Sequence, residues 1–280
     1  KKSYKFVRIV INNSNIGFSS ANNVGVKNSS GEILFFLNND TRIFSKAIEK
    51  LIAYKDFQNL NIIGPRILNE KKKDLLALGK YMGADFLGYP GQSRKLFYVD
   101  GCALMISRTD FEKLGGFDEK YFMYSEDIDL CWRAHLYGMK IGVCQDTAVI
   151  HFGGGSSETT MYEKGEKHIV PVKRRYEVEK NTLRNILKNY QVINLLWIIP
   201  IFIIQYFCES LIYLVSGNFK MTLVLYRAII WNICNINDTL YLRKIVQKQR
   251  IVSDNKVLPL MDFPVNKLKA FFHMGIPRYI

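Results

Sequence analysis

The chain has 280 residues, of which 48% are hydrophobic, enough to bury one large core or two modest ones, and this excludes a disordered protein. The net charge of +14 predicts an anionic partner, such as nucleic acid, anionic lipid or a phosphorylated substrate, without choosing among them. The five cysteines form no Cys-x-x-Cys pair, which fits a reducing compartment, and the first residues lack the apolar core of a signal peptide, so we do not expect export.

The first part of the chain alternates short apolar runs with segments of helical spacing. Each run is followed by Asn-, Gly- or Pro-containing turns, as expected at the ends of strands. This order predicts an α/β fold with a mixed sheet flanked by helices. The expected elements are a buried strand over 6–11, a helix from Ser19 or Ser20 to Lys27, a buried strand over 33–37, a helix from Ser45 to about Tyr54 and a strand over 60–64.

The middle of the chain begins with a segment of weak periodicity. Residues 68–95 are rich in Lys and Gly, so they predict a surface loop with at most short strands. The elements expected after it are a strand over 102–106, a short helix ending at Leu114, a helix from Ser125 to about Tyr137 closed by Gly138, and strands over 140–144 and 148–151.

The composition changes near residue 158, which predicts two domains, 1–158 and 159–280. The second is helical and contains two apolar runs, 195–215 and 221–236. The longer run approaches the roughly 20 residues that cross a bilayer, but it is interrupted by Pro200, Gln205 and Glu209.

These runs predict a helical hairpin at the interface of an anionic membrane, on its cytoplasmic face. A soluble helical subdomain that buries the apolar faces against itself remains the alternative. The basic residues expected to reach lipid headgroups are Arg174, Arg175, Lys188, Arg243, Lys244, Lys248 and Arg250.

Residues 118–133 concentrate acidic and aromatic side chains. Ser125 is a suitable N-cap, and Glu126, Asp127 and Asp129 fall in the first helical turn, with Arg133 four residues after Asp129. Acids at a helix start are stabilising by themselves, so this spacing fits a plain helix start and a catalytic carboxylate equally well.

Other candidates lie at predicted strand and helix ends. Asp40 follows a strand at the sheet edge where ligands bind, and its carboxylate could hold Mg²⁺ or Mn²⁺, although Asn38-Asn-Asp-Thr is also ordinary turn sequence. His151 ends a strand before the glycines at 153–155 and is either a ligand or a structural histidine. Asn15, Gly17 and Asn22 flank a helix start that could receive phosphate, without forming a known glycine-rich loop.

Five segments in this order resemble the motifs of family 2 glycosyltransferases, especially the rhamnosyltransferase-like branch. The resemblance covers about residues 6–155 and, more loosely, 176–185. The segments are NIGFSSANN at 15–23, LNNDT at 37–41, VDGCALMIS at 99–107, GFDEKYFMYSEDIDLCWR at 116–133 and VIH at 149–151.

The resemblance implies a GT-A fold that transfers a sugar from a nucleotide diphosphate donor with inversion, using a divalent cation (Mg²⁺ or Mn²⁺). The acceptor it implies is a cell-surface polysaccharide or lipid-linked glycan. Asp127 then matches the catalytic base, Asp40 and His151 the metal ligands, and Asn38 the first position of the Asp-x-Asp motif. Asp100 and Gly101, with Glu126, match the pocket for sugar and acceptor, and Asn15, Gly17 and Asn22 belong to the donor side.

Family members begin with a strand, a helix and a second strand that bind the nucleotide base. Nothing before residue 6 corresponds to this unit, so the resemblance implies an N-terminally incomplete domain. The alternative to an active enzyme is therefore an inactive remnant that binds sugar nucleotide or serves as a membrane-bound scaffold. A nucleic-acid role has only the net charge in its favour, and we expect no nucleic-acid partner.

Overall fold

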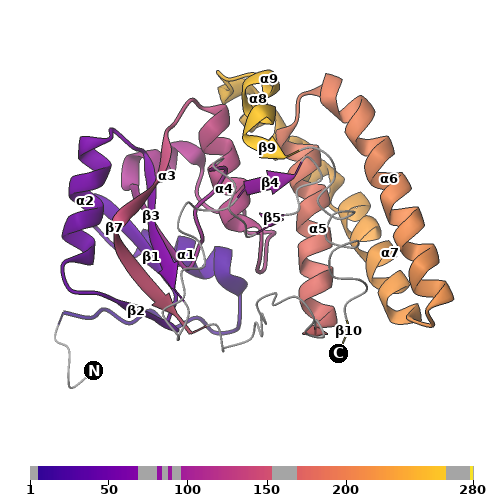
Figure 1. Cartoon of the computed structure of the whole chain (residues 1–280), viewed down its shortest axis with the longest axis horizontal. Coiled ribbons are helices and arrows are strands. Elements are labelled where there is room, and N and C mark those ends of the chain that lie inside the picture. Colours follow the sequence, from indigo (N-terminus) through magenta and orange to yellow (C-terminus); the bar gives the residue numbers. More distant parts are fainter. Residues whose placement is uncertain are drawn as a thin grey trace.

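The structure is a computed structural model, and it describes residues 6–68, 81–83, 88–89, 96–152, 169–262 and 278–279. Figure 1 shows a sheet with helices on both faces, followed by a group of long helices at one end. The glycines at 153–155 and the predicted domain boundary after residue 158 lie outside the described residues.

A five-stranded mixed sheet forms the centre of the first part, in the order β1-β6-β3-β7-β2. The β3–β7 pair is parallel, and the β1–β6, β6–β3 and β7–β2 pairs are antiparallel. The predicted mixed sheet is therefore confirmed. Its strands are β1 (Ile33–Leu37), β2 (Thr41–Ile43), β3 (Ile62–Leu68), β6 (Ala103–Ser107) and β7 (Ile141–His151).

Two strands extend past the ends that turn residues predicted. β3 continues through Pro65, where the register with β7 shifts, because a proline is tolerated at a bulge that needs no N–H donor. The two strands expected over 140–144 and 148–151 are one strand, β7. The residues between them form a bulge opposite Pro65 and Arg66, and the strand continues on both sides of it. β1 is an edge strand, and Ile33 and Leu37 are 39% and 40% exposed.

The strand predicted over residues 6–11 is wrong. This apolar run is in no strand, and Phe6, Val7 and Ile11 are 102%, 59% and 84% exposed. Within the described residues, the sheet ends at β1 and no helix covers the run. Apolar, β-branched sequence forms a strand only where a neighbouring strand and a covering layer complete it.

Helices cover both faces of the sheet. α2 packs on one face, where Leu51 joins Ile63, Met105 and Cys144. α1, α3 and α4 cover the other face, and their apolar residues continue into the core of the helical part. The bounds are α1 (Gly17–Lys27), α2 (Ala47–Phe57), α3 (Arg108–Leu114) and α4 (Glu126–Leu136).

Two helix starts differ from the predicted serine caps, and a third keeps its serine without the cap hydrogen bond. α1 begins at Gly17, because the Asn15 side chain accepts from the Gly17 N–H at 3.0 Å and the Phe18 N–H donates to the Phe122 carbonyl at 2.6 Å. α2 begins after Lys46, not at Ser45. Ser125 does precede α4, but its hydroxyl makes no cap hydrogen bond. Tertiary contacts therefore override the local capping preference.

The second part consists mainly of helices that pack on α4. The rings of Trp132 in α4 and Tyr190 after α5 meet edge to face with centroids 4.6 Å apart, inside one continuous apolar core. The helices are α5 (Val172–Asn189), α6 (Val192–Val215), α7 (Phe219–Cys234), α8 (Ile236–Gln249), α9 (Asp254–Val257) and the 3-10 turn η1 (Leu258–Leu260). The remaining short strands are β4 (Tyr81–Gly83), β5 (Gly88–Tyr89), β8 (Ile169–Val170), β9 (Met261–Asp262) and β10 (Arg278–Tyr279).

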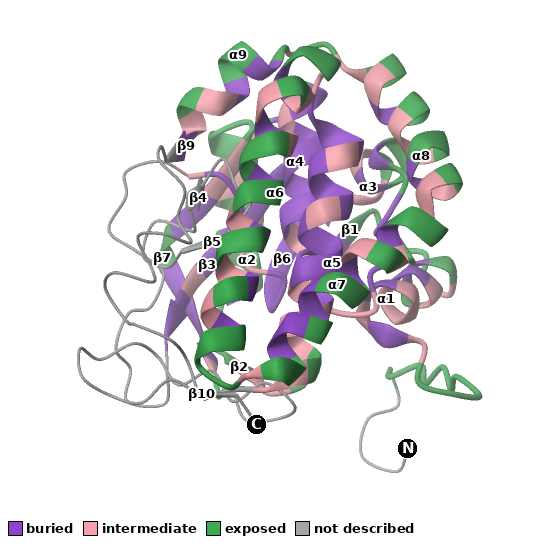
Figure 2. Ribbon diagram, turned by 90° about the vertical axis from the view of Figure 1, so that its right-hand side faces the viewer, coloured by how far each residue is buried: buried purple, intermediate pink, exposed green. Residues whose placement is uncertain are grey.

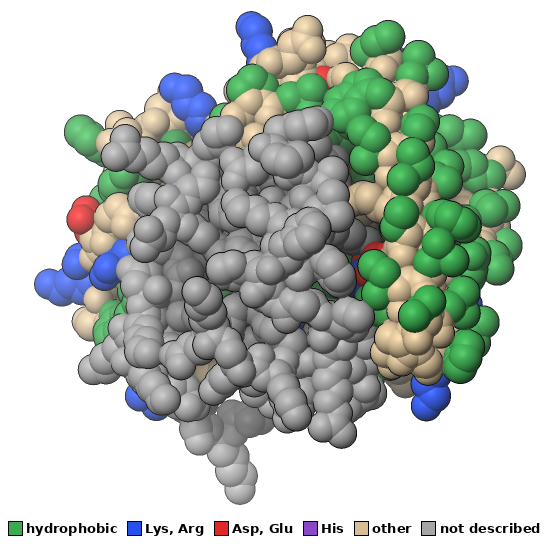
Figure 3. All heavy atoms as spheres, turned by 45° about the vertical axis from the view of Figure 1, so that its right-hand side comes forward, with side chains coloured by type: hydrophobic (Ala, Val, Ile, Leu, Met, Phe, Trp, Pro, Cys, Tyr) green, Lys and Arg blue, Asp and Glu red, His purple; other side chains and the backbone are tan. Residues whose placement is uncertain are grey.

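The faces of α6 are reversed relative to those of an ordinary surface helix. The side that faces the protein buries Asn194, Tyr206, Ser210 and Tyr213 together with the apolar Ile198 and Phe202. The opposite side is exposed and apolar, as Figure 2 shows in green and Figure 3 shows as a cover of hydrophobic side chains. By length and composition, α6 could cross a bilayer; its mean hydropathy is 1.9 and 22% of the apolar window is buried. Its exposed residues are Val192, Ile193, Leu196, Pro200, Ile201, Ile203, Ile204, Phe207, Cys208, Leu211, Leu214 and Val215.

The expectation that seven basic side chains reach lipid headgroups is wrong for most of them. Lys188 is buried between two aspartates, and Arg175 contacts two glutamates. Arg243 and Arg250 donate to main-chain carbonyls at the C-terminal end of α5, where cations satisfy the last acceptors of a helix. The other three are Arg174, whose guanidinium lies 5.1 Å from the Tyr124 ring centroid, and the exposed Lys244 and Lys248.

Candidate functional site

One rim of the sheet collects the ends of its strands. β1, β3 and β7 finish there and the antiparallel β6 begins there, as the strand registers require. Residues 38–40 connect the two edge strands along this rim. The Asn38 N–H donates to the Cys102 carbonyl at 2.9 Å, and the Phe152 N–H donates to the Asp40 carbonyl at 2.9 Å. The rim therefore brings together the segments that hold Asp40, Asp100 and His151.

Asp40 and His151 are adjacent at this rim. Their strands pair at Thr41 and His151, and the His151 Nε2 lies 3.2 Å from the Asp40 Oδ1. That oxygen is buried and receives no hydrogen bond from the described residues. A buried carboxylate oxygen without a donor suits a cation, because hard oxygen ligands bind Mg²⁺ or Mn²⁺.

The pair supplies only part of a metal coordination shell. No group of three or more His, Cys, Asp or Glu side chains that could hold a metal occurs in the part of the chain that the structure describes. A cation bound with nucleotide commonly takes one or two protein ligands and completes its shell with phosphate oxygens and water. The two side chains fit a cation that arrives together with a diphosphate.

Asp127 is joined to the same rim through Gly101. The Gly101 N–H donates to the Asp127 Oδ2 at 2.9 Å, and the Ile128 N–H lies 2.8 Å from the Asp127 Oδ1. A Cβ added at Gly101 would come within 3.2 Å of the Asp127 Cβ. Glycine at 101 therefore leaves room for the carboxylate, while the Asp100 Oδ1 accepts from the Cys102 N–H at 3.0 Å and fixes the turn.

Glu126 precedes Asp127 and differs from it in environment. Its side chain is buried, and its Oε2 has no hydrogen-bond partner among the described residues. Burial, and then the charge of Asp127 beside it, raise the pKa of Glu126 well above the ordinary value. Burial and the neighbouring carboxylate therefore both disfavour the charged form of Glu126.

The turn before these carboxyl groups has unusual backbone. Tyr124 and Ser125 have φ of 71° and 65°, the left-handed region that costs a non-glycine residue about 1 kcal/mol or more. The Asn181 side chain on α5 donates to the Met123 and Tyr124 carbonyls at 2.9 and 2.7 Å. α5 therefore stabilises the turn that directly precedes Glu126 and Asp127.

The three residues predicted for the donor side have local partners. The Asn15 side chain and the Phe122 carbonyl accept from the first two N–H groups of α1, which leaves fewer donors for a phosphate than predicted. Gly17 lies against the Phe122 carbonyl, where a Cβ would clash. The Asn22 side chain donates to the Phe18 carbonyl within the same helix at 2.9 Å. Donor binding by these residues stays a prediction.

Sequence reasoning did not predict the buried ion pairs on either side of Glu126 and Asp127 in the chain. Asp118 and Asp129 are buried and paired with Lys188, and Arg184 contacts Asp118. The sequence feature that could have indicated them is a run of polar residues at spacings of three and four in α5. The same spacing is equally typical of a helix face in contact with water. The pair of Asp129 and Arg133, indicated by their spacing of four residues, is confirmed at 2.7 Å, and it is buried.

Two sequence models of glycosyltransferases match this chain. The model "Glycosyl transferase family 2" matches residues 1–115, and "N-terminal domain of galactosyltransferase" matches residues 80–153. Together they span the rim residues described above. The first 115 residues of the chain therefore match the family 2 glycosyltransferases.

Relatives of this glycosyltransferase are similar over part of their length. One is the low-salt glycan biosynthesis hexosyltransferase Agl10 of Haloferax volcanii, which is 32% identical over 53% of this chain and 53% of its own. Another is the dTDP-rhamnosyl transferase RfbF of Shigella flexneri, 26% identical over 66% of this chain and 64% of its own. The chain therefore spans between half and two thirds of the length of these two relatives.

Among solved structures, the Staphylococcus aureus TarS 1–349 structure in complex with UDP-GlcNAc aligns with 82% of this chain and 71% of its own, at a TM-score of 0.48 and 15% identity.

Proposed function

We propose that this family 2 glycosyltransferase has a GT-A fold and moves a sugar, with inversion, from a nucleotide diphosphate sugar to an acceptor hydroxyl. The observation that carries the proposal is the pair of contacts at one rim: Asp40 with His151, and Asp127 with the Gly101 N–H. The relatives named above favour rhamnose or a related hexose as the sugar. The name of the Haloferax relative mentions glycan biosynthesis, and we propose a cell-surface polysaccharide or lipid-linked glycan as the acceptor.

Asp127 is the group we assign as general base. Its carboxylate accepts the proton of the acceptor hydroxyl as that oxygen attacks the anomeric carbon and the bond from this carbon to the diphosphate oxygen breaks. Hydrogen bonds from the Gly101 and Ile128 N–H groups hold the carboxylate in one orientation. The raised pKa of Glu126 disfavours a second negative charge beside the base.

Asp40 and His151 are the groups we assign to the divalent cation, Mg²⁺ or Mn²⁺. When bound, such a cation would supply positive charge to the diphosphate that leaves. The protein's own contribution is to place the Asp40 Oδ1, which accepts no hydrogen bond from the described residues, 3.2 Å from the His151 Nε2, so that both atoms could bind one cation. We place the donor diphosphate at this end of the rim and the acceptor beside Asp100, Gly101 and Glu126.

Replacing Asp127 by Asn tests the assignment of the base. We expect D127N to lower turnover of UDP-glucose or dTDP-rhamnose onto an alkyl glycoside by about 100-fold or more, because general-base catalysis contributes on that order. The control is D146N, since Asp146 is exposed on β7 away from the rim. Undiminished turnover by D127N would overturn the assignment.

Calorimetry separates an active enzyme from an inactive remnant. We expect UDP or dTDP to bind the full chain in the presence of Mn²⁺, and H151A to weaken that binding at equal nucleotide concentration. Binding without turnover of any nucleotide sugar would favour the remnant. If the nucleotides do not bind with or without Mn²⁺, the proposed donor site is wrong.

We also propose that the protein attaches to the cytoplasmic face of a membrane through the exposed side of α6. This helix of 24 residues is about 36 Å long, and its exposed side carries no charged residue along the whole described helix. Its polar side contacts α5, so rotating the helix into the protein would expose polar groups instead of covering the apolar ones. An interfacial orientation lets lipid cover one side while protein covers the other.

A further inference from the structure

α5 carries a stripe of polar side chains that is buried. Residues three and four apart lie on one face of a helix, and such a face is ordinarily polar only when it meets water. Here every member is 4% exposed or less. The stripe consists of Asn181, Arg184, Asn185, Lys188 and Asn189.

Each member of the stripe contacts the segment 118–129, which includes Asp127. Asn181 donates to the carbonyls of the left-handed turn before Glu126, and the Tyr121 hydroxyl donates to the Asn185 side chain at 3.0 Å. The Asn189 side chain donates to the Asp129 Oδ1 at 3.0 Å. Three uncharged side chains of α5 therefore hold the segment to the helix, at Tyr121, at the turn over residues 123–124 and at Asp129.

The charged members hold the segment more strongly. Lys188 Nζ lies 2.6 Å from Asp118 Oδ2 and 2.8 Å from Asp129 Oδ1, so one ammonium group bridges the two aspartates on either side of Glu126 and Asp127. Arg184 Nε lies 2.8 Å from the same Asp118 oxygen. Burial opposes the ionisation of Asp118, but Lys188 and Arg184 outweigh it and lower the pKa of that carboxyl.

The charges of this cluster are balanced. Asp118, Asp129 and Asp238 face Arg133, Arg184 and Lys188 through the printed ion pairs, three of each sign. Breaking one buried ion pair leaves an uncompensated charge that must move towards water or find a new partner. Removing the Lys188 ammonium group would therefore displace the segment that contains Asp118 and Asp129.

We propose that the polar stripe of α5 is a positioning element that holds the 118–129 segment, and with it Asp127, in place, and that Lys188 is its central positioning residue. The positioning of Asp127 for chemistry depends on the proposed function, whereas the restraint of the segment does not. α5 would thus be part of the construction of the active site as well as a support for α6.

The test compares two buried lysines of the same helix. Lys180 is buried like Lys188 but contacts Glu177 within α5 and the Trp231 ring, not the segment. K188M and K180M each remove one buried ammonium group, so both are expected to lower the melting temperature. Only K188M is expected to loosen the segment.

Amide hydrogen exchange of the full chain reads the segment directly. We expect the peptide over 118–129 to exchange about 10-fold faster or more in K188M, and to stay within about 2-fold of wild type in K180M, because local opening follows the lost contacts. An unchanged rate in folded K188M, or an equal acceleration in K180M, would overturn the proposal. If K188M does not fold, N181A replaces it, since Asn181 contacts the turn with a neutral side chain.

Steady-state kinetics test the effect on Asp127. We expect K188M to lower kcat by about 10-fold to 100-fold with the donor KM within about 3-fold, because a misplaced base costs turnover while the donor contacts lie elsewhere. Loss of donor affinity without loss of kcat would contradict the positioning role. If D127N leaves turnover intact, the proposed function fails, while the exchange result still decides whether α5 restrains the segment.

Discussion

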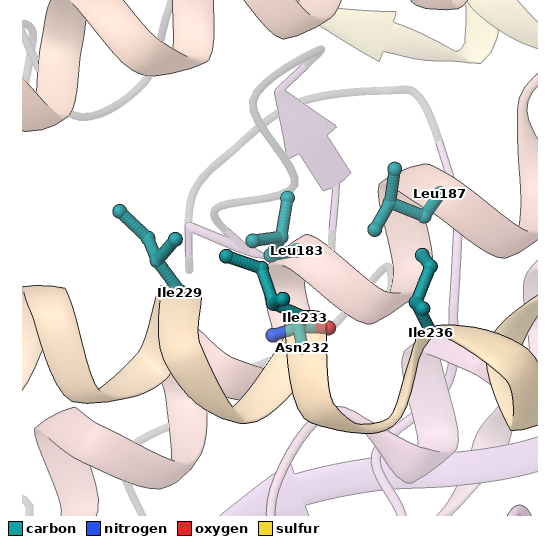
Figure 4. A pocket seen from close by; sticks show the side chains of 6 residues that line it. All are labelled: Leu183, Leu187, Ile229, Asn232, Ile233 and Ile236. Atoms are coloured by element: carbon teal, nitrogen blue, oxygen red, sulfur yellow. The ribbon is translucent and has the colours of Figure 1, made fainter.

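α5 and α6 both direct polar side chains towards the protein, but their other sides have different neighbours. The remaining side of α5 meets α7, where Leu183 and Leu187 help to line an apolar pocket of about 150 Å³ (Figure 4). The remaining side of α6 meets nothing in the described chain. The most polar of the long helices is thus largely buried, and the most apolar helix is half uncovered. Composition alone would predict the reverse.

The difference shows that the two helices have different tasks. In α5, buried charges are paired with carboxylates of the 118–129 segment, which fixes one arrangement of two chain regions. In α6, the polar contacts to Arg175 and Glu179 fix which side turns outward. In our proposals, α5 positions residues of the active site and α6 presents a surface to the membrane.

The largest effect is expected from removing a charge on the enclosed helix. R184M leaves Asp118 with one cation fewer and Asp238 without its guanidinium partner, so we expect the free energy of unfolding to fall by about 3–5 kcal/mol. Urea unfolding measures it. K248M, at an exposed lysine of α8, is the control and should change stability by about 0.5 kcal/mol or less. Equal effects of the two substitutions would remove the contrast between buried and exposed cations.

The second largest effect is expected from acid, which should weaken the ion pairs between Asp118 and α5. Folding lowers the pKa of Asp118, so the ionised carboxylate stabilises the fold above its unfolded pKa of about 3.9, and this contribution is lost as the pH falls through the lower folded value. We expect a loss of about 2 kcal/mol below pH 4, on the scale of one salt-bridged aspartate. Unfolding followed between pH 7 and pH 2 should show a shallower pH dependence in D118N, and an unaltered dependence would contradict the assignment.

A smaller effect is expected on the inner side of α6. Glu209 contacts Arg175 and accepts from the Tyr213 hydroxyl at 2.7 Å. Arg175 keeps Glu179 as a partner at 2.7 Å, so E209Q should cost only about 1 kcal/mol, in the range of one hydrogen bond. Thermal unfolding would detect it. A loss as large as that of R184M would show that α6 depends on buried charge as much as α5 does.

The smallest effect on stability is expected from substitutions on the exposed side of α6, which should instead weaken binding to membranes. Ile204 and Phe207 are 61% and 60% exposed, so the double substitution I204S/F207S should change stability by about 0.5 kcal/mol or less. It should also weaken binding to phosphatidylcholine/phosphatidylglycerol vesicles by about 10-fold or more, since each buried apolar side chain contributes on the order of 2 kcal/mol.

Vesicle co-sedimentation measures this binding. The control is F57S, because Phe57 on α2 is 84% exposed and far from α6 in the fold. F57S should bind vesicles like wild type. Binding that is unaffected by I204S/F207S would mean that lipid does not cover this side of α6.

The sequence by itself determined the alternation of strands and helices, the apolar helix and the residues of the rim. Strand β1 and the end of α4 at Gly138 follow from patterns within a few residues, apolar runs and a glycine suited to φ of 73°. The position of Asp40, Asp127 and His151 in motifs likewise needed only their order along the chain.

Only the tertiary structure decided which patterns face the interior and which face outward. Residues 6–11 are apolar like a strand but pair with no strand among the described residues. Lys188 lies in a polar helical segment typical of a surface, but it bridges two buried aspartates. The physical reason is that periodicity assigns residues to a face, whereas burial depends on which distant segment covers that face. For α5, the covering segment lies about 60 residues earlier, at the turn that precedes Asp127.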